Sequence, residues 1–219
     1  MYRDDYIMRM VRHFGQIVLY IAGLRRQGHY PLALIATDEA MRNALGIGSG
    51  QAAGRSEREL LALIRFADRD DSWRELAAYV AAILHAEAAI YEAQGDHELV
   101  APRALLALQL LSEAQIAGDE LPAYAPPRDH LLELLSAYRL PARTRAALLQ
   151  LYEREGAYAR AEDTLFELIA DAPADRALRA HGLALFERLL ARPDAELAAG
   201  GLSRAEVHRA LAELRAAEA

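Results

Sequence analysis

The residues whose types could do chemistry gather in one stretch near the middle of the chain, which contains His85, Glu87, Tyr91 and His97. An imidazole titrates near neutral pH, and a carboxylate or a phenol beside it could share its proton or a metal ion. His85 and Glu87 are too close in sequence to lie on one face of a helix, however. We therefore predict no catalytic residue here and retain Tyr91 and His97 as candidate binding residues.

This stretch lacks the usual sequence patterns of metal-binding sites. No Glu stands three residues before a His, so the di-iron carboxylate motif is absent, and the HExxH zinc motif is absent too. His130 and Glu133 share a helix face, for which a surface pair is the simpler interpretation. We expect no metal site. The alternative interpretation is an enzymatic or small-molecule-binding domain that uses the His85–His97 region. It requires two or more of these residues to converge in a closed pocket with shifted pKa values: His85, Glu87, Tyr91, His97 and His130.

Three arginines surround Pro141, namely Arg139, Arg143 and Arg145. Pro141 precedes a predicted helix, and a helix N-terminus together with guanidinium groups can hold an anion or an acidic peptide. Solvated arginines are the simpler interpretation of the same pattern. We retain the three arginines as candidate binding residues for a protein or peptide partner.

The composition excludes several classes of chemistry. The chain has no Cys, which removes disulfides, thiol nucleophiles and Cys-ligated zinc. All 25 basic residues are Arg, so the Schiff-base lysine, the phosphate-loop lysine and the kinase lysine are missing. The net charge of −7 disfavours contact with nucleic acid. We predict that the protein is not an enzyme and needs no cofactor.

The N-terminal region indicates where the protein resides. Its longest apolar run, Ile17 to Leu24, is too short to cross a bilayer. Asp4 and Asp5 stand where a signal peptide would carry positive charge. The apolar stripe of this first helix could lie on a membrane surface, but it continues into a Gly turn and a second helix, which favours a place in the core. We expect a cytoplasmic protein with no membrane contact.

The elements that must position these residues are all predicted to be helices. Ala and Leu, which favour helices, dominate the sequence, whereas β-branched residues are scarce. Capping boxes, together with Gly and Pro residues at helix ends, divide the chain into about ten predicted helices. Two segments, 46–55 and 118–127, are predicted to be linkers, and 203–217 a C-terminal capping helix. We expect a single domain over residues 1–219.

The stretch 142–173 is predicted to form two helices joined at Gly156, with small and aromatic residues where antiparallel helices touch. It matches the tetratricopeptide signature at Leu148, Tyr152, Ala161, Leu165 and Pro173. Each hairpin of this kind leaves an apolar face uncovered, so neighbouring hairpins must stack. A plain helical bundle is the alternative, because any antiparallel hairpin shares part of this pattern.

Through these residues the chain resembles the tetratricopeptide-like superfamily. Its opening, MYRDDYIMRM, with the Gly156–Ala161 turn and the AGGL stretch at 199–202, also resembles an uncharacterised bacterial family of helical proteins with no assigned function. The resemblance implies an α-solenoid of antiparallel hairpins and supplies no site. Peptide-binding tetratricopeptide domains hold a C-terminal carboxylate with Lys and Asn side chains. This chain has no Lys and only Asn43, so that clamp cannot be carried over.

We therefore predict a non-enzymatic scaffold that binds a protein or peptide along a helical surface, or that associates with a second copy of itself. This interpretation predicts a groove lined by Tyr and Arg, with the histidines dispersed over the structure. The enzymatic alternative predicts instead that histidines gather in a closed pocket.

Overall fold

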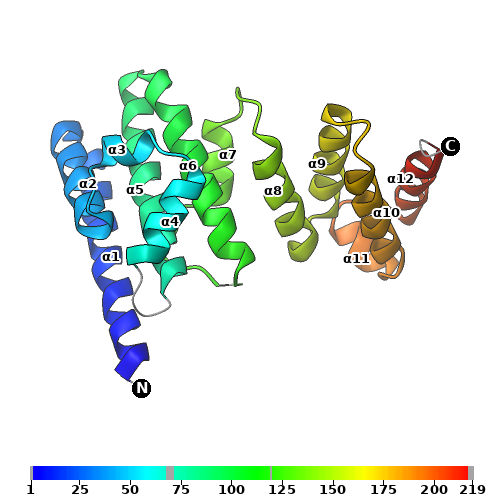
Figure 1. Cartoon of the computed structure of the whole chain (residues 1–219), viewed down its shortest axis with the longest axis horizontal. Helices are drawn as coiled ribbons and strands as arrows, with labels where there is room; N and C mark the ends of the chain where they lie inside the picture. The colour runs from blue at the N-terminus through cyan, green and yellow to red at the C-terminus, as the bar shows by residue number, and fades with distance from the viewer. Residues whose placement is uncertain (1, 68–71, 119, 217–219) are drawn as a thin grey trace. The chain divides into compact units, whose positions relative to one another are not determined.

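The computed structural model describes residues 2–67, 72–118 and 120–216, and within these ranges its regular structure is entirely α-helical (Figure 1). The predicted all-α class is therefore confirmed. The described residues form twelve helices. Two short helices account for the excess over the prediction. They are α3 (Ser49–Ala53), inside the first predicted linker, and α11 (Asp194–Ala199), directly after Pro193.

Contacts divide the chain into two compact units, residues 1–140 and 141–219. The first unit contains α1 (Tyr2–Arg26), α2 (Tyr30–Leu45), α3, α4 (Glu57–Ala67), α5 (Trp73–Gln94), α6 (His97–Ile116) and α7 (Arg128–Leu134). The second unit contains α8 (Ala142–Glu155), α9 (Tyr158–Asp171), α10 (Arg176–Leu190), α11 and α12 (Arg204–Ala216). The boundary falls between Leu140 and Pro141, outside both predicted linkers.

The α5–α6 hairpin forms the core of the first unit, and α1, α2, α4 and α7 pack around it. Both helices bury alanines completely: Ala77, Ala81 and Ala88 in α5, and Ala104, Ala107 and Ala114 in α6. Side chains this small allow helices to pack at short interaxial distances. At the turn between them, Gly95 adopts a φ of 77°, a left-handed conformation that costs glycine little.

The central helix α5 is the one helix in the described part of the chain that is long and apolar enough to cross a membrane. Its most apolar window is 72% buried inside the protein. The helices that cover it are α6, α2, α1 and α4. A helix that is apolar on all sides and covered by its neighbours is typical of a core. The structure therefore has the character of a soluble helical domain.

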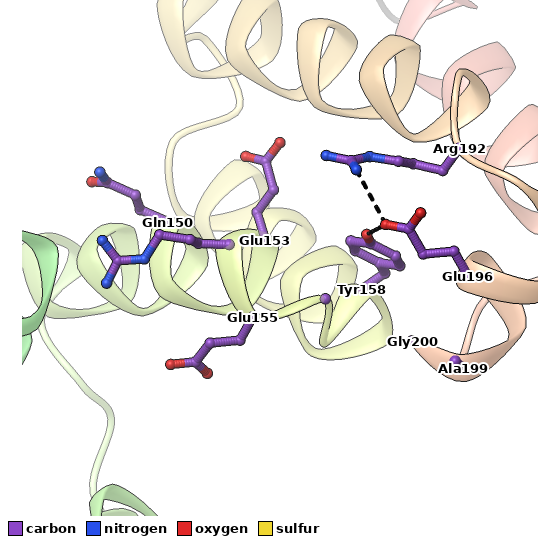
Figure 2. Close-up of a pocket in the computed structure, with 10 residues that line it drawn as sticks. Gln150, Glu153, Glu155, Tyr158, Arg192, Glu196, Ala199 and Gly200 are labelled. Atoms are coloured by element: carbon purple, nitrogen blue, oxygen red, sulfur yellow. Dashed lines mark hydrogen bonds and ion pairs between the residues drawn. The ribbon is translucent and has the colours of Figure 1, made fainter. Parts of the chain in front are cut away.

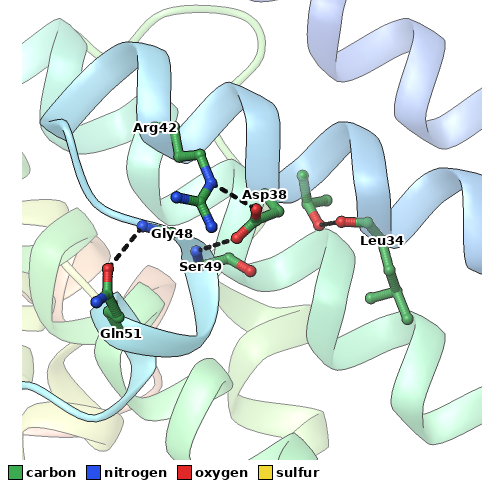
Figure 3. A network of polar contacts seen from close by, with 7 residues as sticks. Leu34, Asp38, Arg42, Gly48, Ser49 and Gln51 are labelled. Atoms are coloured by element: carbon green, nitrogen blue, oxygen red, sulfur yellow. Dashed lines mark hydrogen bonds and ion pairs between the residues drawn. The ribbon is translucent and has the colours of Figure 1, made fainter.

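Side-chain capping explains why α3 forms where the sequence predicts a linker (Figure 3). The Asp38 carboxylate accepts hydrogen bonds from Arg42 Nε at 2.7 Å and from the Ser49 amide at 2.9 Å. The bond from Arg42, followed by the one from Ser49, lowers the pKa of Asp38. The Gly48 amide donates to the Gln51 side chain at 3.2 Å. A Cβ at Gly48 would lie 2.6 Å from Asp38 Oδ1, so a larger residue there would displace the Asp38 and Arg42 side chains.

Three aromatic rings join α1, α5 and the segment before α7. Phe14 stacks on Tyr79 with 3.9 Å between ring centroids, and Tyr124 meets both rings edge-on at 6.2 Å. The Tyr124 hydroxyl donates to the Glu75 carbonyl oxygen at 2.8 Å. Two residues of the apolar stripe of α1 thus pack into the first unit, Phe14 through these rings and Ile21 as a buried side chain.

The second unit begins with the α8–α9 hairpin, and these two helices pack against each other as the sequence predicts. The signature positions Leu148, Tyr152, Ala161 and Leu165 are all buried. Further along, α10 packs on α12 and α9. Gly182 makes this approach possible, because a Cβ there would lie 3.0 Å from side-chain atoms of both Leu165 and Leu214. The stretch predicted to be a C-terminal capping helix is helical over Arg204–Ala216, as α12.

Candidate functional site

An open cleft of about 660 Å³ lies in the second unit, where α8 turns into α9 and α11 passes beside the turn (Figure 2). The lining residues come from the end of α8, the turn, the start of α9 and the segment around α11. They are Gln150, Glu153, Arg154, Glu155, Gly156, Tyr158, Arg192, Glu196, Ala199 and Gly200. Most of them carry polar side chains, so the cleft suits a polar ligand better than an apolar one.

Two glycines shape the floor of this cleft. Gly156 ends α8 with a φ of 75°, which reverses the chain direction into α9. Gly200, just after α11, touches this turn so closely that a Cβ would lie 2.3 Å from the Tyr158 ring and 2.4 Å from the Gly156 carbonyl oxygen. The amide of Ala159 donates to the Gly200 carbonyl oxygen at 2.9 Å. The backbone after α11 is therefore fixed directly on the α8–α9 turn.

A short polar chain crosses one wall of the cleft. The Tyr158 hydroxyl donates to Glu196 Oε1 at 2.7 Å, and the Arg192 guanidinium lies 3.2 Å from the same oxygen (Figure 2). The hydrogen bond to Glu196, together with burial, raises the pKa of the Tyr158 hydroxyl. The phenol therefore stays protonated and acts as a hydrogen-bond donor, not as a base.

Glu153, on the same wall, is held by a residue outside the cleft. Arg188 donates to both carboxylate oxygens of Glu153, at 2.7 and 2.9 Å. Such a two-point contact fixes both planar groups in one orientation. It ties the end of α8 to α10 and orients one of the acidic groups that line the cleft.

The residues that line the cleft carry one more negative than positive charge. The lining carries three carboxylates, those of Glu153, Glu155 and Glu196, against two guanidiniums, those of Arg154 and Arg192. The carbonyl end of α8 also points here and adds partial negative charge. Arg188 already pairs with Glu153, and Arg192 with Glu196, so the excess of negative charge at the cleft is small.

The three predicted arginines have different positions. Arg139 follows α7 in the first unit and is exposed, and Arg143 is exposed on α8 in the second unit. Arg145, by contrast, is buried, and its guanidinium pairs with Asp171 and lies 3.8 Å from Glu167. Both acids belong to α9, so Arg145 holds the α8–α9 hairpin together.

The residues predicted around α5 do not converge on one point. Glu87, which is 1% exposed, pairs with the buried Arg103 at 2.7 Å. The Arg103 guanidinium lies over the Tyr91 ring, 4.6 Å from its centroid. His97 pairs instead with Glu92 at 3.2 Å on the surface. Tyr91 therefore supports a buried ion pair, and His97 lies in a separate, exposed contact.

The remaining two histidines of this region do meet. His85 Nε2 on α5 lies 2.6 Å from His130 Nδ1 on α7, with the rings edge to face. One proton between these two nitrogens satisfies the hydrogen-bonding requirement of both. Burial lowers the pKa of His85 to about 4, with smaller contributions from His130 and Arg25. His85 is therefore neutral at physiological pH and joins α5 to α7.

This contact predicts a pH-dependent stability. The unfolded chain binds a proton at His85 below about pH 6.5, whereas the folded chain resists it down to about pH 4. Stability from this group is therefore complete above the unfolded pKa and is lost as the pH falls from 6.5 towards 4. With the partial exposure of the ring taken into account, we expect a loss of about 1–3 kcal/mol.

The measurement is urea unfolding at pH 7 and pH 4.5, followed by the fluorescence of Trp73, the one tryptophan of the chain. Carboxylates titrate over the same range, so the comparison with His85→Gln isolates the histidine. His85→Gln should lose less stability than the parent on acidification, and His97→Gln, an exposed control, should behave like the parent. An identical pH dependence for parent and His85→Gln would refute this role of the histidine pair.

Within the described ranges, no group of three or more His, Asp or Glu side chains is arranged to hold a metal ion. The histidine pair is the closest approach to such an arrangement, and its nitrogens are already in contact with each other. The residues that line the cleft were not predicted from the sequence. Glu196 lies on α11 and Gly200 directly follows it, and this helix was not predicted. The sequence signal that could have revealed it is Pro193 at its start and Gly200-Gly201 at its end.

Comparison with known proteins places the whole chain in one family. No curated protein and no solved structure matches it significantly. A family of unknown function, DUF6483, matches residues 1–218. The predicted resemblance to an uncharacterised family is thereby supported, whereas no tetratricopeptide family matches. The chain therefore belongs to DUF6483, a family of unknown function.

Proposed function

We propose that this protein is a non-enzymatic scaffold that binds a peptide segment of a partner protein in the cleft of the second unit. The supporting observation is the cleft itself, an open and mostly polar cavity of about 660 Å³. Arg154 and Arg192 line it, beside the buried Tyr158. Tyr and Arg are the residue types that often dominate the energy of protein interfaces. The proposal includes tetratricopeptide-like stacking of the hairpins, a cytoplasmic location and no cofactor.

The charge of the residues that line the cleft indicates which kind of peptide segment binds there. Among the lining residues carboxylates outnumber guanidiniums by one, with Arg188 paired to Glu153 from outside the cleft, and the carbonyl end of α8 adds partial negative charge. The segment we expect therefore carries a Lys or Arg side chain and presents polar groups around it. The bonds from Tyr158 and Arg192 orient Glu196 in advance, which lowers the entropic cost of binding.

Two neighbouring alanines of α11 provide a steric test. Ala199 lines the cleft, whereas Ala198 is an exposed neighbour that does not. A random-peptide display library selected on the full chain should yield sequences rich in Lys and Arg. Ala199→Trp, which fills the cleft, should weaken their binding by about tenfold or more, and Ala198→Trp should leave it nearly unchanged.

Two outcomes would contradict the proposal. The selection could yield no enriched peptides, or the enriched peptides could bind Ala199→Trp and the parent equally well. Circular dichroism of both tryptophan variants checks that the fold is retained, so a loss of binding by unfolding is recognised.

A further inference from the structure

The α1–α2 hairpin carries an unusual share of exposed apolar side chains. Leu19 and Tyr20 on α1 are 69% and 61% exposed, and Leu32 and Ile35 on α2 are 53% and 56% exposed. Elsewhere in the described residues, large apolar side chains are exposed singly, as Phe66 and Tyr138. Isolated exposed apolar residues are ordinary, but four on one hairpin indicate a contact surface.

The stretch 6–37 of this hairpin is basic, although the chain as a whole is acidic and Asp4, Asp5, Asp38 and Glu39 flank the stretch. Residues 6–37 contain no Asp or Glu, in a chain whose net charge is −7. Four arginines fall in this stretch, Arg9, Arg12, Arg25 and Arg26. Arg9 and Arg26 are exposed on the same helix as Leu19 and Tyr20. A surface of this kind attracts a negatively charged partner and repels a basic one.

The packing of the unit determines where this surface faces. The helices α1 and α2 contact each other, and both also contact α5. Their buried sides, including Ile21 and Ala33, face these neighbours. On α1, residues 9, 16, 19, 20, 23 and 26 follow helical spacing and lie on the opposite, outer side. The apolar and basic side chains therefore share the outer side of α1.

We propose that the outer face of the α1–α2 hairpin docks on the surface of an anionic lipid bilayer. Aliphatic side chains such as Leu19 and Ile35 gain from insertion between lipid headgroups, and the arginines gain from anionic headgroups. Nucleic acid fits less well, because aliphatic side chains do not stack on bases. A second copy of the same face would bring like charges together. The docking is peripheral and uses side chains other than Phe14 and Ile21, which pack into the first unit. It replaces the expectation from the sequence that the protein has no membrane contact.

Vesicle flotation of the full chain tests this proposal. Vesicles of phosphatidylcholine with roughly one third phosphatidylglycerol should carry the protein upward, and pure phosphatidylcholine vesicles should carry far less. Leu19→Ser with Ile35→Ser should lower the bound fraction about tenfold, and Arg9→Gln with Arg26→Gln should lower it to a similar extent and reduce its sensitivity to salt. Phe66→Ser and Arg58→Gln, which change exposed residues outside the hairpin, are the matched controls.

Three results would overturn the proposal. The first is failure of the parent to float with anionic vesicles. The second is equal binding to neutral and anionic vesicles, or binding that the hairpin variants leave unchanged. The third is a dimer in sedimentation that Leu19→Ser with Ile35→Ser dissociates, without vesicle binding, which assigns the face to a second copy. All substituted positions are exposed, and circular dichroism verifies that each variant is folded.

Discussion

Arg103→Met should lower the free energy of unfolding of the first unit by about 3–5 kcal/mol. Arg103 is the ion-pair partner of Glu87, and both side chains are almost inaccessible to solvent, at 8% and 1% exposed. Removal of the guanidinium leaves a buried carboxylate without a counter-charge, which costs more than the pair itself contributes. The second carboxylate oxygen, Oε1 of Glu87, already has no hydrogen-bond partner. Urea unfolding followed by Trp73 fluorescence measures the loss, because Trp73 lies in the same unit.

A double variant separates this mechanism from loss of packing. Glu87→Met with Arg103→Met removes both charges and keeps similar side-chain volume, so it should recover most of the lost stability. A single Arg103→Met variant that loses less than about 1 kcal/mol would contradict the account. A double variant as unstable as the single one would indicate that the Arg103 stem over Tyr91, and not the charge, provides the stabilisation.

The second large effect is expected at Gly200, where alanine should disrupt the attachment of α11 to the α8–α9 turn. The new methyl would meet both the Tyr158 ring and the Gly156 backbone at impossible distances, and backbone cannot rotate away as a side chain can. We expect a cost of about 2–3 kcal/mol and a loss of peptide binding in the cleft. Hydrogen exchange of residues 156–161 and 197–202 should accelerate, because the bond from Ala159 to Gly200 lies between these segments.

Gly23→Ala is the control for this substitution. Gly23 lies inside α1, and nothing is within 4 Å of the position its Cβ would take. Alanine there should be neutral or stabilise the helix by about 0.5–1 kcal/mol. If Gly200→Ala changed the free energy of unfolding as little as Gly23→Ala, that result would contradict the close contact between Gly200 and the α8–α9 turn.

Local sequence signals predicted the elements that depend on local interactions. The capping boxes Ser56–Glu59 and Ser203–Glu206 both form, with the serine amide donating to the glutamate at 2.8 and 2.7 Å. The α8–α9 hairpin follows from the Gly156 turn and its flanking helical periodicity. Each of these features requires only residues that are close together in the chain.

The remaining features depend on residues distant in sequence. The glycine-rich composition of 46–55 suggests a linker, but α3 forms there because Asp38 on another helix caps it. Arg145 lies among exposed arginines in the sequence, and only the packing of α9 brings Asp171 to it. His85 and His130 meet because α7 returns beside α5–α6, which no local spacing indicates. The cleft likewise requires Gly200 to reach the α8–α9 turn.

Hydrogen–deuterium exchange of the full chain with a display-selected basic peptide tests the central claim most directly. If the cleft of the second unit is the binding site, the peptide should slow exchange in residues 150–158 and 192–200, and Ala199→Trp should abolish that protection. Protection confined to other segments, such as the α1–α2 hairpin, would contradict the claim, as would protection at the cleft that persists in Ala199→Trp.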